Sequence, residues 1–174
     1  EHYAKRGSTI KIYRHGLFRR ADGYCGGVIV WGLPTKGAAI ATAPEYDFRT
    51  VLSLSRLALR ADVPTNGASF LIAASIKAIT ADNKYRCLVT YADTREQHIG
   101  TIYKATGWEY LGLVDGDTTW IDPAGNTVAR QRSGGGRSRA EMYEAGLRPI
   151  GKWQKHKFRM FLQPPASERK LRVL

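Results

Sequence analysis

The chain has 174 residues, 43% of them hydrophobic, which suits one domain with a real core, and 27 Lys and Arg against 15 Asp and Glu give it a net charge of +12. This basic charge makes nucleic acid the leading expected partner, since the surface field attracts polyanions. The two cysteines lack the spacing of a zinc site or a disulfide framework and are expected to be buried thiols in a reducing cytoplasm, and no apolar run is long enough to cross a membrane.

The first half of the chain predicts three strands and a helix. Apolar runs bounded by turn residues indicate strands over residues 8–14, 24–31 and 51–59. A helix is expected over residues 66–80, because four aliphatic residues recur there at helical spacing behind the candidate cap Asn66. Alternation along the third strand puts Ser55 and Arg56 on opposite faces.

The middle of the chain continues the alternation of strands and helices. The pattern predicts a strand over residues 86–92, a short helix over residues 100–106 and a strand over residues 108–114. This order indicates an α/β (α+β) fold with a central mixed, twisted sheet flanked by helices.

Two basic segments follow a predicted hairpin at residues 118–129. Residues 130–139 hold arginines around three glycines and are expected to form a mobile loop, with a solvated linker as the alternative. Residues 152–159 mix basic and aromatic side chains, which suits nucleic acid but also a strand with an inward aromatic face. The candidate phosphate contacts are Arg130, Arg132, Arg137, Arg139, Lys152, Lys155 and Lys157.

The strongest candidates for catalytic residues lie at the end of the strand at residues 86–92 and just after it. Tyr91 and Asp93 emerge on one side near its carboxyl end, where open α/β sheets usually bind ligands. Asp93 and Glu96 also fit a helix capping box. Against an immediate helix stands Gly100, which would cost about 1 kcal/mol relative to Ala at its centre. A loop over residues 93–99 avoids that cost and brings His98 beside Tyr91 and Asp93.

Several short motifs around these residues carry a family resemblance. Four motifs, Leu54-Ser55-Arg56-Leu57, Tyr91-Ala92-Asp93, the run from His98 to Thr106, and Tyr110-Leu111-Gly112, resemble the Mom family of phage DNA-modification proteins. That family is a divergent branch of the GCN5-related N-acetyltransferase (GNAT) fold. One departure is Lys104, where the family pattern suggests Gln. The resemblance implies a single GNAT-like catalytic domain over residues 1–163 and a tail over residues 164–174.

The resemblance also implies a function. It suggests a phage-encoded transferase that places a carbamoylmethyl (acetamido-type) group on adenine N6 in DNA and so protects the DNA from host restriction. Its partners would be double-stranded DNA with a flipped adenine and a small-molecule or carrier-bound donor, with no membrane, acting in the host cytoplasm. A homodimer is left open.

Roles follow for the residues in these motifs. Asp93 or His98 is expected to accept the N6 proton, and Arg56 to stabilise negative charge. Asp93 and His98 could instead be two ligands of an iron-type metal. The predicted catalytic set is Asp93, His98, Tyr91, Arg56, Tyr103 and Ser55.

The donor is less clearly indicated. GNAT enzymes cradle the CoA diphosphate on backbone N–H groups before the central helix, but residues 60–68 keep one glycine and contain Pro64, which has no N–H. Acyl-CoA and an aminoacyl-type carrier therefore both stay open. Asn66, Gly67 and Thr101 are the donor-binding candidates. Two other functions remain: a conventional GNAT acyltransferase acting on a small-molecule or protein amine, and a non-catalytic nucleic-acid-binding module.

Overall fold

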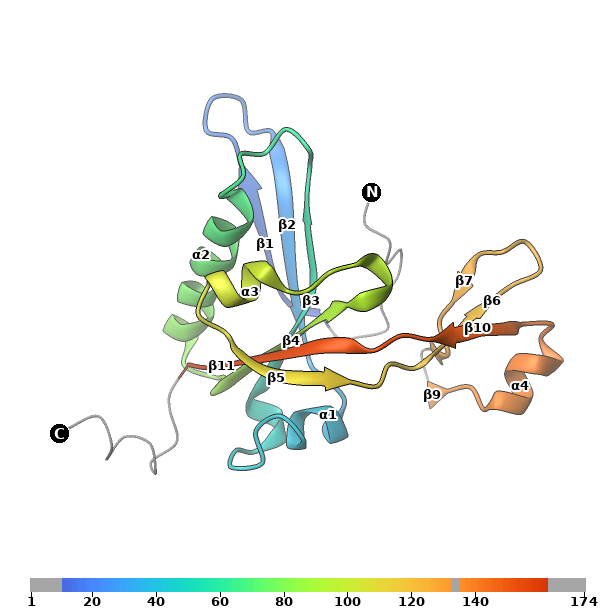
Figure 1. Ribbon diagram of the computed structural model, residues 1–174. Helices are drawn as coiled ribbons and strands as arrows, with labels where there is room; N and C mark the ends of the chain where they lie inside the picture. The colour runs from blue at the N-terminus through green and yellow to red at the C-terminus, as the bar shows by residue number, and fades with distance from the viewer. Residues whose placement is uncertain (1–10, 133–134, 163–174) are drawn as a thin grey trace.

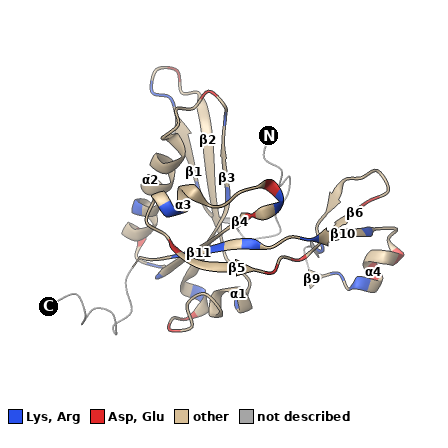
Figure 2. Ribbon diagram, viewed as in Figure 1, with Lys and Arg blue, Asp and Glu red and all other residues tan. Residues whose placement is uncertain are grey.

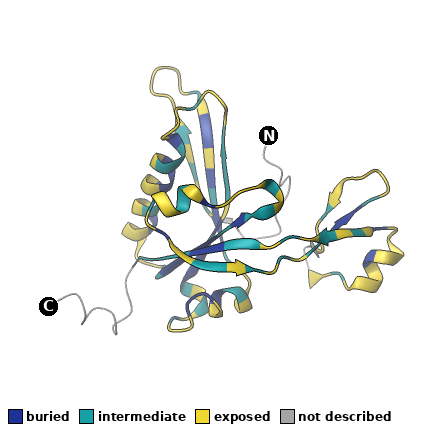
Figure 3. Cartoon of the chain, in the orientation of Figure 1, coloured by how far each residue is buried: buried dark blue, intermediate teal, exposed yellow. Residues whose placement is uncertain are grey.

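The computed structural model describes residues 11–132 and 135–162. Its main body is a six-stranded sheet with helices on both faces, and a smaller arm of short strands and one helix projects from one end of it (Figure 1). Figure 3 shows that the buried residues follow the strands and helices of the main body, whereas the arm is largely exposed. None of the described helices is long and apolar enough to cross a membrane.

The main sheet is mixed, and its last strand along the chain lies near its middle. In spatial order its strands are β1 (Lys11–Phe18), β2 (Cys25–Gly32), β3 (Val51–Leu59), β4 (Cys87–Asp93), β11 (Lys155–Phe161) and β5 (Glu109–Val114). Among the described strands of this sheet, only β3 and β4 pair in parallel. Because β11 is inserted between β4 and β5, its residue Phe158 is completely buried.

Two helical layers cover the sheet. The helices are α1 (Lys36–Ile40), η1 (Phe48–Thr50), α2 (Gly67–Asp82), η2 (Thr94–Glu96), α3 (Thr101–Ala105) and, in the arm, α4 (Arg139–Glu144). Side chains of β4 alternate between the layers: Leu88 joins the core under α2, and Val89 joins the cluster under α1. The predicted helix at residues 66–80 is confirmed, although the Asn66 side chain makes no capping hydrogen bond.

The predicted alternation of side chains between the two faces of β3 is wrong after Leu54. Leu54 pairs with Trp31 and Arg56 pairs with Val30, so that Ser55 is an extra residue in a β-bulge. The bulge returns Leu57 to the same core as Leu54. A sequence pattern of period two cannot reveal such an insertion.

The arm contains two short strands within the predicted basic loop at residues 130–139, and the mobility of this loop stays a prediction. Its strands are β6 (Thr118–Ile121), β7 (Thr127–Val128), β8 (Gln131–Arg132), β9 (Gly135–Gly136) and β10 (Arg148–Lys152). The hairpin predicted at residues 118–129 is confirmed as β6 and β7. Helix α4 begins with a capping box between Ser138 and Glu141, and buried Trp120, Met142 and Leu147 form the arm's own core.

The two cysteines differ in their surroundings. Cys87 is buried, as expected, in the cluster under α1. Cys25 is exposed at the start of β2, which corrects the expectation of two buried thiols.

Candidate functional site

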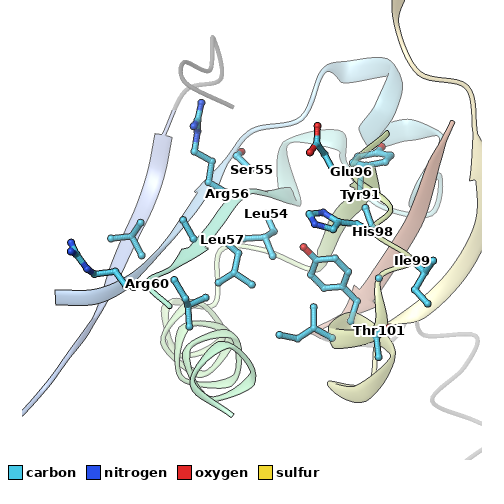
Figure 4. Close-up of a pocket in the computed structure, with 18 of the residues that line it drawn as sticks. Leu54, Ser55, Arg56, Leu57, Arg60, Tyr91, Glu96, His98, Ile99 and Thr101 are labelled. Atoms are coloured by element: carbon cyan, nitrogen blue, oxygen red, sulfur yellow. The ribbon is translucent and has the colours of Figure 1, made fainter. Parts of the chain in front are cut away.

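A cavity opens where the two parallel strands separate. Strands β3 and β4 pair only from Val51 to Ser53 and from Cys87 to Val89, and then they diverge. A space of about 1280 Å³ lies beyond this point, walled by β2, the second half of β3, and the segment from β4 to α3 (Figure 4). The cavity thus lies at the carboxyl ends of the parallel strands.

The cavity brings together most, but not all, of the predicted site residues. Those that line it are Ser55, Arg56, Tyr91, His98, Thr101 and Tyr103. The predicted residues absent from its walls are Asp93, Asn66 and Gly67. The predicted loop over residues 93–99 followed by a short helix is confirmed, and Gly100 precedes α3 in the left-handed region with φ +72°.

Asp93 holds the turn after β4 instead of lining the cavity. Its Oδ1 accepts a hydrogen bond from the Arg95 backbone N–H at 3.0 Å, and its Oδ2 lies 3.7 Å from the Lys155 Nζ. The His98 N–H donates to the Asp93 carbonyl at 3.2 Å and closes the turn. Asp93 therefore caps the three-residue helix η2, whereas the long helix that the capping-box alternative requires is wrong.

Glu96 is the carboxylate that lines the cavity. It projects from the same turn as His98 (Figure 4) and is half-buried. The sequence pattern predicts that Glu96 belongs to a capping box with Asp93. Such a box forms only when the two residues flank the first turn of an α-helix. Because η2 is followed by Gln97 in the left-handed conformation at φ +55°, the chain turns sharply there. Residue spacing alone carries no signal for that turn.

The two tyrosines enter the cavity from different layers. Tyr103 packs against Trp108 and Phe158, with ring centroids 5.7 Å and 5.4 Å away, whereas Tyr91 packs against the cluster under α1. Burial raises the pKa of both phenols. Both therefore stay protonated at neutral pH and serve as hydrogen-bond donors, not as bases.

The bulge on β3 presents two polar side chains to the cavity. The Ser55 hydroxyl makes a long contact of 3.4 Å to the Ser53 carbonyl. Arg56 is half-buried and makes no ion pair or hydrogen bond with another described residue. Its guanidinium is therefore available to an anionic or carbonyl group of a ligand.

The start of α2 does not fit a CoA diphosphate. The Gly67 N–H already donates to the Pro64 carbonyl at 2.8 Å, and Pro64 itself has no N–H. The Asp62 carboxylate of the same turn accepts a hydrogen bond from the Tyr24 hydroxyl at 3.2 Å. Asn66 and Gly67 line a separate space of about 320 Å³, so both are corrected as donor-binding candidates in the main cavity.

Metal binding gains no support from the geometry. Within residues 11–132 and 135–162, no three His, Cys, Asp or Glu side chains are grouped closely enough to share a metal ion. The proposed pairing of Asp93 with His98 therefore has no third protein ligand in the described part of the chain.

The predicted phosphate contacts divide into buried, engaged and exposed residues. Lys157 is only 7% exposed and donates to the Ala41 carbonyl at 3.2 Å, which corrects its assignment to DNA. Arg130 and Arg137 donate to backbone carbonyls of their own hairpin at 2.9 Å and 2.7 Å. Lys155 faces Asp93.

Two of the predicted phosphate contacts, Arg139 and Lys152, are both exposed and unpaired among the described residues. Arg139 and Lys152 make no ion pair with another residue that the structure describes. Figure 2 shows basic residues at the start of α4, at the ends of β10 and on the main-sheet strand β11. The side chain of Arg132, another predicted contact, lies outside the described residues.

Comparisons with known proteins agree on family and fold. A model of the Mom protein family matches residues 1–173. The chain is 28% identical over 116 residues to the methylcarbamoylase mom of Escherichia phage Mu, an alignment that covers 64% of this chain and 46% of that protein. The chain thus spans less than half the length of this curated relative.

Solved acetyltransferases share the fold. An N-acetyltransferase from Staphylococcus aureus Mu50 superposes with a TM-score of 0.50 at 12% identity, covering 83% of this chain and 65% of that one. A yncA acetyltransferase from Salmonella typhimurium, solved with acetyl-CoA, gives 0.50 at 11% identity, covering 84% and 64%. At this identity the likeness establishes the fold alone, and the expected GNAT-like fold is confirmed.

Proposed function

The chain belongs to the Mom protein family, and on that premise we propose that it transfers a carbamoylmethyl group to N6 of adenine in phage DNA. One observation carries the proposal: the cavity between the diverging strands holds His98, Glu96 and two protonated tyrosines together. The relative in phage Mu is named a methylcarbamoylase. Modified DNA would resist host restriction endonucleases.

The site has room for a DNA base. Ligand cavities of about 300 to 1000 Å³ hold drug-sized molecules, so a space of about 1280 Å³ can take an adenine and a compact donor side by side. Adenine N6 is hidden in the stacked duplex, so the base must leave the helix to reach the cavity. The net charge of +12 favours binding of the phosphates on either side.

The chemistry assigns a role to each side chain in the cavity. A bond forms from N6 to the donor's methylene carbon, the bond from that carbon to its leaving group breaks, and N6 loses one proton. His98 accepts this proton, and Glu96 on the same turn orients the base or the imidazole. Tyr91 and Tyr103 donate hydrogen bonds to the ring nitrogens or to the donor carbonyl. Arg56 stabilises the departing negative charge.

The donor in this proposal is compact and carries no CoA diphosphate. The start of α2 supports this restriction, because the Gly67 N–H already donates to the Pro64 carbonyl and Pro64 has no N–H at the place that GNAT enzymes use. A conventional acyl-CoA transferase would need the cradle that this chain lacks.

The function is tested by challenging DNA with restriction endonucleases. DNA from cells that express the wild type should resist enzymes whose sites contain adenine, and DNA from cells that express His98→Ala should be cut. His156→Ala is the matched control, because His156 of β11 shares a hydrogen bond with Tyr110 of β5 and does not line the cavity. DNA that stays fully sensitive with soluble wild-type protein would contradict the proposal and favour a non-catalytic binding module.

The roles of the two carboxylates are separated by a second pair of variants. Glu96→Gln should lower protection without lowering the melting temperature, because Glu96 lines the cavity and makes no structural ion pair with a described residue. Asp93→Asn should lower both, because Asp93 caps η2 and faces Lys155. The opposite pattern would return the catalytic role to Asp93.

A further inference from the structure

A second apolar space lies at the tip of the β1–β2 hairpin. It measures about 320 Å³ and is enclosed by the end of β1, the hairpin turn and the first turn of α2. Two phenylalanines from distant parts of the chain border it, Phe18 and Phe70, and each is 63% exposed. Large apolar side chains this exposed, on one patch, mark a binding surface.

Arginines surround this aromatic patch. The guanidinium carbons of Arg19 and Arg60 lie 4.8 Å and 5.2 Å from the centre of the Tyr24 ring. Arg19 also pairs with Asp22, whereas Arg20 and Arg60 make no ion pair with any residue in the described part of the chain. Planar aromatic surfaces with free cations at their rim suit a ligand that combines a flat ring with negative charge.

The patch adjoins the main cavity. Gly26 on β2 contributes to both spaces, and Arg60 lines the main cavity while its guanidinium stacks on Tyr24. A Cβ at Gly26 would lie 2.7 Å from a Val63 methyl, so the backbone there is closely packed between the two spaces. The patch therefore lies next to the main cavity, separated from it by the backbone at Gly26 and the Val63 side chain.

We propose that Phe18, Phe70 and Tyr24 form a stacking platform for an unpaired DNA base next to the modified adenine, with Arg20 and Arg60 on the flanking phosphates. This inference rests on the proposed function, since it takes DNA to be the substrate. It explains why apolar rings are exposed at the tip of a hairpin beside the cavity. It also explains how the space left by a flipped adenine is stabilised, because the neighbouring base stacks on protein.

The platform is tested by fluorescence anisotropy with a labelled DNA duplex that carries two adjacent unpaired adenines. The double variant Phe18→Ala/Phe70→Ala should bind this duplex more weakly by roughly tenfold to a hundredfold, the usual effect of losing base stacking. Phe18→Trp should keep wild-type affinity. Leu113→Ala is the control, since Leu113 is an exposed apolar residue of β5, away from the patch.

Three results would overturn the platform. The first is an affinity of the double variant within twofold of wild type. The second is unchanged DNA affinity in the double variant together with loss of wild-type binding to acetyl-CoA, which would assign the patch to a donor's nucleobase. The third is a wild-type dimer that the double variant converts to a monomer, which would assign the patch to a second copy of the chain.

The binding measurement is independent of group transfer. Wild-type protein that binds the duplex through the patch but leaves adenine unmodified would contradict the proposed function and keep the platform. A double variant that binds and modifies DNA as well as wild type would remove the platform and keep the function.

Discussion

Gly100 fixes the position of the residues around the cavity. It adopts φ +72° immediately before α3, and a Cβ there would lie 2.3 Å from the Phe158 ring. Gly100→Ala should therefore lower the free energy of unfolding by about 2 to 4 kcal/mol, through backbone strain and overlap together. Gly107→Ala is the matched control, because Gly107 has φ +82° but open space around its Cβ position.

Urea unfolding of the two glycine variants separates strain from overlap. Gly107→Ala should cost only about 1 kcal/mol, the strain of a positive φ. Equal losses in both variants would mean that the Phe158 ring yields to the added methyl group.

The buried thiol of Cys87 should make the free energy of unfolding decrease at alkaline pH. Burial raises the pKa of its thiol to about 12, from an ordinary value of 9.0. The pKa of this thiol is higher in the folded state than in the unfolded state. The buried, protonated thiol therefore stabilises the fold fully below about pH 9, and this stabilisation is lost as pH rises toward 12. The stability difference between wild type and Cys87→Ala should therefore narrow above pH 9 by up to about 1.4 kcal/mol per pH unit.

Urea titrations of both proteins at several alkaline pH values measure this difference. The comparison cancels the titration of lysines and tyrosines that the two proteins share. A constant difference from pH 8 to 11 would contradict a protonated, buried Cys87.

At the scale of elements, the turn that carries Glu96 and His98 is braced by the connection between the arm and the main sheet. The Thr94 hydroxyl donates to the Gln154 carbonyl at 2.6 Å, and the Arg95 guanidinium stacks over the Trp153 ring at 4.9 Å. The cavity and the arm therefore share one structural junction.

Replacing Trp153 should loosen this junction. Trp153→Ala is expected to speed hydrogen exchange of the backbone amides at residues 94–98 and to lower DNA modification by about tenfold, since the turn is no longer held against the sheet. Tyr143→Ala is the control, because Tyr143 contacts Trp120 within the arm. Unchanged hydrogen exchange at residues 94–98 would show that the hydrogen bonds of Thr94 hold the turn without Trp153.

Local periodicity predicts some elements of this fold, whereas contacts between distant segments determine others. The helix at residues 66–80 and the strands on either side of it were predicted because their periodicity is local. The place of β11 between β4 and β5, the bulge at Ser55 and the turn at Glu96 depend on contacts between distant segments. The burial of Lys157 could not be predicted for the same reason, because β11 is a central strand only through its pairing with β4 and β5.

At the scale of the whole molecule, the positive charge should act through exposed residues only. Lys152→Met should weaken DNA binding and reduce the slope of log affinity against log salt concentration by about one, the effect of one lost phosphate contact. Lys157→Met should leave that slope unchanged and lower the free energy of unfolding by about 1 to 3 kcal/mol, because the Ala41 carbonyl loses its donor.

Salt titrations of DNA binding and urea unfolding of both lysine variants provide the comparison. A reduced salt slope in Lys157→Met would mean that β11 opens toward DNA. The buried position of Lys157 argues against this result.

The most direct test of the account is mass spectrometry of nucleosides from the DNA of cells that express the protein. The account predicts a deoxyadenosine in which one hydrogen is replaced by a carbamoylmethyl group, present with wild type and His156→Ala and absent with His98→Ala. A mass increment equal to an acetyl group would contradict the proposed transfer and restore an acyl donor. Unmodified deoxyadenosine, with soluble protein that binds DNA, would contradict catalysis in this cavity altogether.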